Sequence, residues 1–179
     1  MGNFSLVTYG ILIINIVAYL KTKGGGYYIE KYGMRADKVL NNKEFYRLVT
    51  CMFMHANPMH IFLNMYGLWS IGLRLENSLG HLKFLAFYMG MGILTGLLSC
   101  VARKQFNSQS TVSIGASGVL YALFGIYIGM LIRVVGLIPA VTMSFSSLLP
   151  IIIISFIPGI DVYAHISGLL VGICTGFFM

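Results

Sequence analysis

The stretch Gly115-Ala116-Ser117-Gly118-Val119-Leu120-Tyr121 opens an apolar run that continues to about Ile132. From its serine onward, four residues recur at every fourth position: Ser117, Tyr121, Gly125 and Gly129. Residues spaced in this way share one face of a helix. Small residues at that spacing let two helix backbones approach closely inside a membrane. The stretch therefore predicts a membrane helix that packs tightly on a neighbour and carries a serine at its start.

The expected neighbour is the last apolar run, residues 162–179, in which Ala164-His165 is followed by Gly168, Gly172 and Gly176. Ionisable side chains at membrane depth usually face a bundle interior or a water-filled cavity and carry function. A histidine is suited to accept the proton of a serine near neutral pH. Close helix packing explains the two rows of small residues, but it does not explain the serine and the histidine at which the rows begin. The pair predicts a hydrolase built inside a membrane.

The composition agrees with an all-α membrane protein. Of 179 residues, 58% are hydrophobic and only 9% are charged, whereas soluble domains carry about 25% charged residues. We expect residues 1–179 to form a single membrane domain. The net charge of +7 comes from basic residues spread over short connectors. This pattern favours topology signals and lipid headgroup contacts over nucleic-acid binding.

Metal and disulfide sites are not expected. Cys51, Cys100 and Cys174 are scattered and show no CxxC spacing, which favours packing roles. A metal site would draw on His55, His60 and His165, but zincins place two histidines four apart with a glutamate between them. Here the first two are five apart and no acid intervenes. We predict no metal and no cofactor.

Apolar runs of nearly bilayer length predict a six-transmembrane-helix bundle. The spans cover residues 4–20, 58–73, 82–102, 115–132, 136–156 and 162–179. The first run lacks a basic leader and a cleavage motif, so we expect it to be retained. The long loop 21–57 mixes aromatic and basic residues, which is typical of a segment in the membrane interface. Pro139 and Pro150 predict a kinked fifth span, and the apolar connector 157–160 suits a lid.

Polar residues gather where the second span starts. Asn57 is a good helix cap and Pro58 suits the first turn, so His60 and Asn64 lie one above the other on one face. Two stacked donors aimed into a bundle are what an oxyanion hole needs. The alternative is that they only hold helices together.

A third member of a catalytic triad is not evident. No carboxylate lies within any of the six expected spans. Asp161 precedes His165 by four residues and is close enough in sequence to reach its ring, but it stands just before the sixth span. Capping that helix is the commoner role for an aspartate there.

Three motifs together resemble the rhomboid family of intramembrane serine proteases. They are His55-Ala56 with His60 and Asn64, Gly115-Ala116-Ser117-Gly118 with Tyr121, and Ala164-His165 with Gly168. The resemblance runs from about Glu44 to the C-terminus and differs at Tyr46-Arg47, where the family has Trp-Arg.

The resemblance implies a dyad in which Ser117 is the nucleophile and His165 the general base. His60, Asn64 and the Ser117 backbone N–H would hold the oxyanion. Tyr121 would orient the base, Gly115 would leave room for the substrate backbone, and His55 would be structural. The implied activity is a serine endopeptidase that cleaves transmembrane segments of membrane proteins, so its partners would be transmembrane protein substrates and the lipid bilayer.

The resemblance also implies the minimal six-span bacterial type, in the bacterial plasma (inner) membrane with a cytoplasmic N-terminus. The active site would then open to the outer face. The positive-inside rule favours the reverse orientation, because most Lys and Arg residues lie in loop 21–57. Two other functions stay open. One is a catalytically inactive rhomboid-like protein that binds membrane clients, and the other is a channel or transporter, which normally shows internal repeats.

Overall fold

The expected all-α class is confirmed by a computed structural model, which describes residues 5–155 and 160–179. Within these residues there is no strand, only an isolated antiparallel bridge between Met34 and Ser113. The helices are α1 (Leu6–Thr22), α2 (Gly26–Tyr32), α3 (Ala36–Leu40), α4 (Arg47–Thr50), the 3₁₀ turn η1 (Cys51–Phe53), α5 (Pro58–Leu79), α6 (His81–Gln105), α7 (Ser117–Val135), α8 (Leu137–Ser155) and α9 (Val162–Phe178).

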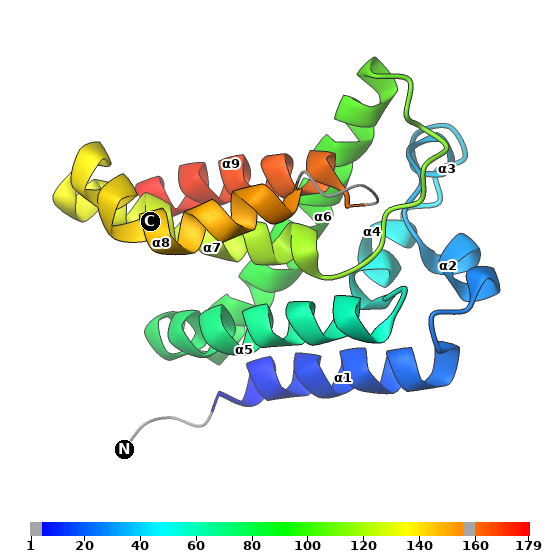
Figure 1. Cartoon of the computed structure of the whole chain (residues 1–179), viewed down its shortest axis with the longest axis horizontal. Coiled ribbons are helices and arrows are strands. Elements are labelled where there is room, and N and C mark those ends of the chain that lie inside the picture. The colour runs from blue at the N-terminus through cyan, green and yellow to red at the C-terminus, as the bar shows by residue number, and fades with distance from the viewer. Residues whose placement is uncertain (1–4, 156–159) are drawn as a thin grey trace.

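The long helices form two packed pairs joined by α6. Figure 1 shows α1 and α5 side by side, and α7 beside α9, with α6 crossing both pairs and packing against all four helices. The α7–α9 pair is the closest. A Cβ added to Gly172 would lie 2.0 Å from the Ala122 carbonyl oxygen, and one added to Gly176 would lie 2.1 Å from that of Ile126. The close helix packing that the glycine spacing predicts is therefore confirmed.

Local residue chemistry sets where the site-bearing helices begin. The Asn57 side chain accepts a hydrogen bond from the His60 N–H at 2.9 Å and Pro58 is the first helical residue, as predicted. α7 begins at Ser117, not at Gly115 as expected. Gly115 has a φ of +105°, a conformation that favours glycine and does not belong to a right-handed helix. The nucleophile candidate thus stands at the helix start.

The end of α5 corrects the sequence prediction. The helix continues to Leu79, beyond the expected end at residue 73, and includes the buried Glu76. α5 thus carries one buried carboxylate, three residues beyond the end of the expected span. The Glu76 carboxylate accepts the N–H groups of Val7 and Thr8 at 2.9 and 2.8 Å. Hydropathy alone does not predict that the start of α1 supplies donors to this carboxylate.

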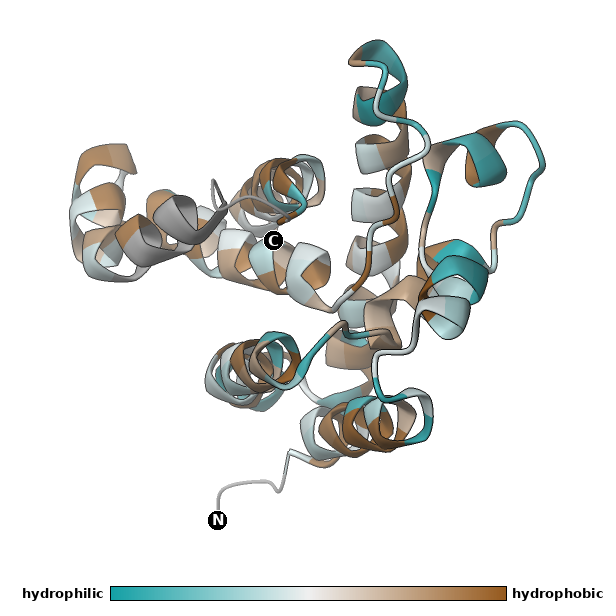
Figure 2. Cartoon of the chain, turned by 45° about the vertical axis from the view of Figure 1, so that its right-hand side comes forward, coloured by the Kyte–Doolittle hydropathy of each residue, from teal (hydrophilic) through white to brown (hydrophobic). Residues whose placement is uncertain are grey.

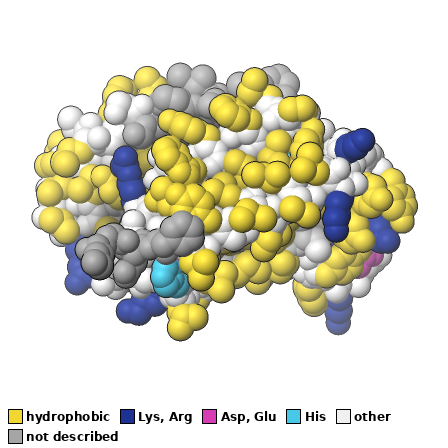
Figure 3. Space-filling model, turned by 90° about the horizontal axis from the view of Figure 1, so that it is seen from below, with side chains coloured by type: hydrophobic (Ala, Val, Ile, Leu, Met, Phe, Trp, Pro, Cys, Tyr) yellow, Lys and Arg dark blue, Asp and Glu magenta, His cyan; other side chains and the backbone are white. Residues whose placement is uncertain are grey.

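Apolar surface dominates the outside of the bundle. Figure 2 shows hydrophobic residues along the long helices and hydrophilic ones at connectors, and Figure 3 shows one face largely covered by apolar side chains. By length and composition, α6 and α7 are able to cross a membrane. The apolar stretches Leu6–Thr22, Leu137–Ser146 and Val162–Phe178 are shorter. The count of six spans stays a prediction.

The connector between α1 and α5 is built around Arg47. Its guanidinium donates to the carbonyl oxygens of Glu30 and Gly33, both at 2.7 Å, and pairs with Glu44 at 2.6 Å. These bonds join the end of α2 to the start of α4. Residues 21–57 also contain α3 and η1, so the connector is more ordered than a simple loop. Of the proposed lid, residues 157–159 lie outside the described residues, as does Phe156 of the fifth span.

Candidate active site

Ser117 and His165 meet at the crossing of α7 and α9. His165 Nε2 lies 2.9 Å from Ser117 Oγ, and the histidine side chain is buried. This separation is within the range that proton transfer requires. Both residues stand in the first turn of their helices. Close glycine packing below them brings the two helix starts together, because no side chain keeps the backbones apart.

Tyr121 lies one turn below Ser117, against the imidazole of His165. The two rings are stacked, with centroids 4.0 Å apart and an interplanar angle of 12°. A ring lying flat on the imidazole restricts its rotation. The structure therefore places Tyr121 where it can keep Nε2 directed at the serine.

The segment before Ser117 is held from the α1–α5 connector. The Gly115 N–H donates to the Cys51 carbonyl oxygen at 2.9 Å. Met34 and Ser113 exchange two backbone hydrogen bonds of 2.9 and 2.8 Å. These three bonds fix the approach to α7, so the position of Ser117 depends on residues far from it in sequence.

His60 lies beside the backbone that precedes Ser117. A Cβ added to Gly115 would come within 2.6 Å of His60 Nε2, so only glycine leaves room for this ring. His55, which is 1% exposed, contacts the His60 ring edge-on with centroids 5.0 Å apart. Burial lowers the pKa of His55 to about 4, so this ring is neutral at physiological pH.

Asn64 lies one turn further along α5 than His60. Its amide donates to the His60 carbonyl oxygen at 2.8 Å. Its own carbonyl oxygen is buried and has no hydrogen-bond partner among the described residues. The amide carries two hydrogens and that bond uses one. The second amide hydrogen is the one that would bind an oxyanion. The oxyanion role of both Asn64 and His60 stays a prediction.

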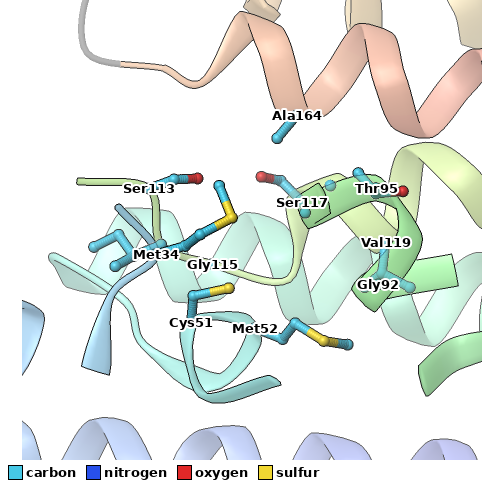
Figure 4. A pocket seen from close by; sticks show the side chains of 13 residues that line it. Met34, Cys51, Met52, Gly92, Thr95, Ser113, Gly115, Ser117, Val119 and Ala164 are labelled. Carbon is cyan, nitrogen blue, oxygen red and sulfur yellow. The ribbon is translucent and has the colours of Figure 1, made fainter. Parts of the chain in front are cut away.

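A small cavity adjoins Ser117. It has a volume of about 20 Å³, which is room for one water molecule. Figure 4 shows Met52 and Cys51 on one side of it and Ala164 on the other, with Thr95 beside Ser117. The Thr95 hydroxyl is buried and has no partner among the described residues. The cavity therefore offers space and the Thr95 hydroxyl next to Ser117.

Asp161 caps α9, as predicted, but it also has partners that sequence reasoning missed. Its carboxylate accepts the Ala164 N–H at 3.0 Å, pairs with Arg103 at 2.6 Å and accepts the Ser113 hydroxyl. No sequence spacing links these residues. In the described part of the chain, no group of three or more His, Cys, Asp or Glu residues is placed to hold a metal ion.

Sequence comparisons with known proteins point to one family. The family model described as Rhomboid domain matches residues 42–179. RHOMBOID-like protein 5 of Arabidopsis thaliana is 31% identical over 155 residues, covering 84% of this chain and 49% of the relative. Putative rhomboid protease YdcA of Bacillus subtilis (strain 168) is 32% identical over 142 residues, covering 77% and 67%. Rhomboid-like protease 2 of Toxoplasma gondii is 29% identical over 152 residues, covering 83% and 52%.

The chain spans about half the length of the first curated relatives it matches. The family match, in contrast, covers the described helices α4 to α9 and both residues of the serine–histidine pair. The protein belongs to the rhomboid family of integral membrane proteins.

Proposed function

We propose that this protein is an intramembrane serine endopeptidase that cleaves transmembrane segments of other membrane proteins. The observation that carries the proposal is the 2.9 Å approach of His165 Nε2 to Ser117 Oγ. The serine oxygen attacks the scissile carbonyl while the imidazole takes its proton. The imidazole then gives that proton to the leaving amine. A water molecule, activated by His165, hydrolyses the acyl-enzyme and frees the serine.

The charge that develops on the carbonyl oxygen needs donors. We propose the Ser117 N–H, which no preceding helical turn uses, together with the side chains of His60 and Asn64. The contact between Gly115 and the His60 ring supports this, because it puts a donor beside the nucleophile's backbone. The cavity beside Ser117 would receive the substrate residue whose carbonyl is attacked.

For the membrane arrangement we propose six spans, with the N-terminus in the cytoplasm and the site opening outward. The starts of α5, α7 and α9 lie on the same side of the molecule as the folded connector 21–57 (Figure 1), which supports water access from a single side. A substrate helix would have to unwind locally there to expose its scissile bond. Helix-weakening residues near that bond are therefore expected in substrates.

Labelling with a fluorophosphonate probe tests the proposal. Detergent-solubilised protein should become labelled, and Ser117→Ala and His165→Ala should lose both labelling and cleavage of a model transmembrane substrate. Labelling that persists in Ser117→Ala would exclude this serine as the nucleophile.

A second candidate is a catalytically inactive rhomboid-like protein that binds membrane clients. Several relatives of this chain are named rhomboid-like proteins, and their names do not mention a protease. The same experiment separates the two functions. A binding protein would retain a client in a pull-down but would neither react with the probe nor cut the client.

A further inference from the structure

One carboxylate touches both segments that carry the dyad. Ser113 stands four residues before Ser117, and its hydroxyl donates to Asp161 Oδ2. Asp161 stands four residues before His165. Its other carboxylate oxygen accepts the Ala164 N–H at 3.0 Å, and its backbone carbonyl accepts the His165 N–H at 3.1 Å. The aspartate thus starts the helix that bears the base and binds the loop that bears the nucleophile.

Arg103 anchors this carboxylate from the end of α6. Its guanidinium pairs with Asp161 Oδ1 at 2.6 Å, and the arginine is 3% exposed. The guanidinium carbon also lies 5.3 Å from the centroid of the Tyr163 ring, in the first turn of α9. Phe106, which follows α6, stacks on the same ring with centroids 5.8 Å apart. The ion pair is therefore enclosed, and water screens it little.

We infer that Asp161 is a positioning residue for the Ser117–His165 dyad, held in place by Arg103 and acting through Ser113. The inference rests on the proposed function. A helix cap alone requires only the bond to Ala164. Asp161 also binds Ser113 and Arg103. Through these bonds one rigid side chain fixes the distance between two segments that are 48 residues apart in sequence. A small displacement of reacting groups costs as much as about 100-fold in rate, so this coupling matters for catalysis.

The first test breaks the bridge and keeps the cap. Ser113→Ala removes the hydroxyl that binds Asp161 and leaves the Arg103 pair and the Ala164 bond in place. Its matched control is Ser99→Ala, which removes a buried α6 hydroxyl that has no partner among the described residues. The measurement is the rate of fluorophosphonate labelling against probe concentration, which separates the maximal rate kinact from the half-saturating concentration KI.

We expect kinact of Ser113→Ala to fall by about tenfold, with KI and Tm near those of the wild type. Ser99→Ala should keep wild-type values of kinact, KI and Tm. A Ser113→Ala protein that labels as fast as the wild type would overturn the inference and leave the proposed function standing. Wild-type protein that does not label at all would overturn both.

The second test removes the ion pair without leaving a buried charge. Arg103→Met combined with Asp161→Asn takes away both charges, and the asparagine still caps α9. Replacing both members of a buried pair by uncharged groups is often neutral for stability. We expect Tm of this double variant to approach that of the wild type while kinact stays at least tenfold lower. Wild-type kinact in the double variant would reduce Asp161 to a structural cap and contradict the inference.

Discussion

The ring of Tyr121 lies flat on the imidazole of His165, 4.0 Å away between centroids and 12° from parallel. Both rings come from the paired helices α7 and α9, and Ser117 precedes Tyr121 by one turn. The same helix thus supplies both the proposed nucleophile and the ring that packs on its proposed base. The stacking makes a simple prediction for activity.

Tyr121→Ala should lower kcat by about tenfold, because aromatic stacking contributes about 0.5–1.5 kcal/mol and the freed imidazole samples other rotamers. Tyr121→Phe keeps a ring at this position and should lose less activity. Cleavage of a model transmembrane substrate at saturating concentration measures the effect. Equal losses in the two variants would show that the ring face is not what orients His165.

Asn64→Ala should reduce turnover by less than Ser117→Ala does. One oxyanion donor is worth about 10²–10³ in kcat in a well-studied soluble protease, and here it is one donor among several. Initial rates of substrate cleavage, with Ser117→Ala as the baseline, measure the difference. If Asn64→Ala fell to that baseline while remaining folded, Asn64 would have a more central role than support of the oxyanion.

The cavity beside Ser117 predicts a preference for small residues. Met52 limits its size, and the tip of that side chain occupies the space where a Cβ on Gly92 would stand, 2.4 Å away. Met52→Ala should raise the ratio of kcat/KM for substrates with Phe before the scissile bond to those with Ala, by about tenfold or more. The ratio does not depend on the folded fraction. An unchanged ratio would mean that the substrate side chain lies elsewhere.

Glu76→Gln should destabilise the protein without changing its chemistry. The carboxylate accepts the Thr8 hydroxyl at 2.6 Å as well as two α1 N–H groups, and a glutamine would turn an NH₂ group toward these donors. We expect a loss of about 2–4 kcal/mol, measured by thermal unfolding in detergent. Thr8→Val, which removes only the hydroxyl, should cost less. Below the unfolding range both variants should label normally, because Glu76 lies at the end of α5 away from Ser117.

Acid should destabilise the fold through His55. Burial lowers the pKa of this histidine from 6.5 to about 4, so between these values the unfolded chain binds a proton that the folded chain does not. The free energy of unfolding is therefore unaffected by the titration of His55 above pH 6.5. It decreases as the pH falls from 6.5 toward 4, by about 3 kcal/mol at most.

His55→Phe keeps a buried ring that does not titrate. Its Tm in detergent should therefore fall less between pH 7 and pH 5 than the Tm of the wild type. The same decrease in both proteins would show that other groups cause the acid sensitivity.

Much of the architecture follows from the sequence because it depends on local chemistry. Four-residue spacing of glycines predicts the α7–α9 contact, since periodicity on a helix is a local property. Asn57 and Pro58 locate the start of α5, and Asp161 the start of α9, since a cap needs only the next few residues. The serine and the histidine stand out because polar groups are costly in an apolar run.

Other features depend on partners distant in sequence, and these follow only from how the helices pack. The apolar run ends at Leu73 because Arg74 and Glu76 follow it, yet α5 continues to Leu79. The buried Glu76 carboxylate has partners there because α1 brings two N–H groups to it. The residues around Asp161 in the sequence predict only a helix cap. Its bonds to Ser113 and Arg103 form only once α6, α7 and α9 have packed. Local sequence patterns thus predict the long helices and the meeting of Ser117 with His165. Packing determined which buried charges are satisfied, because a charge is tolerated inside a protein only where the fold supplies its partner.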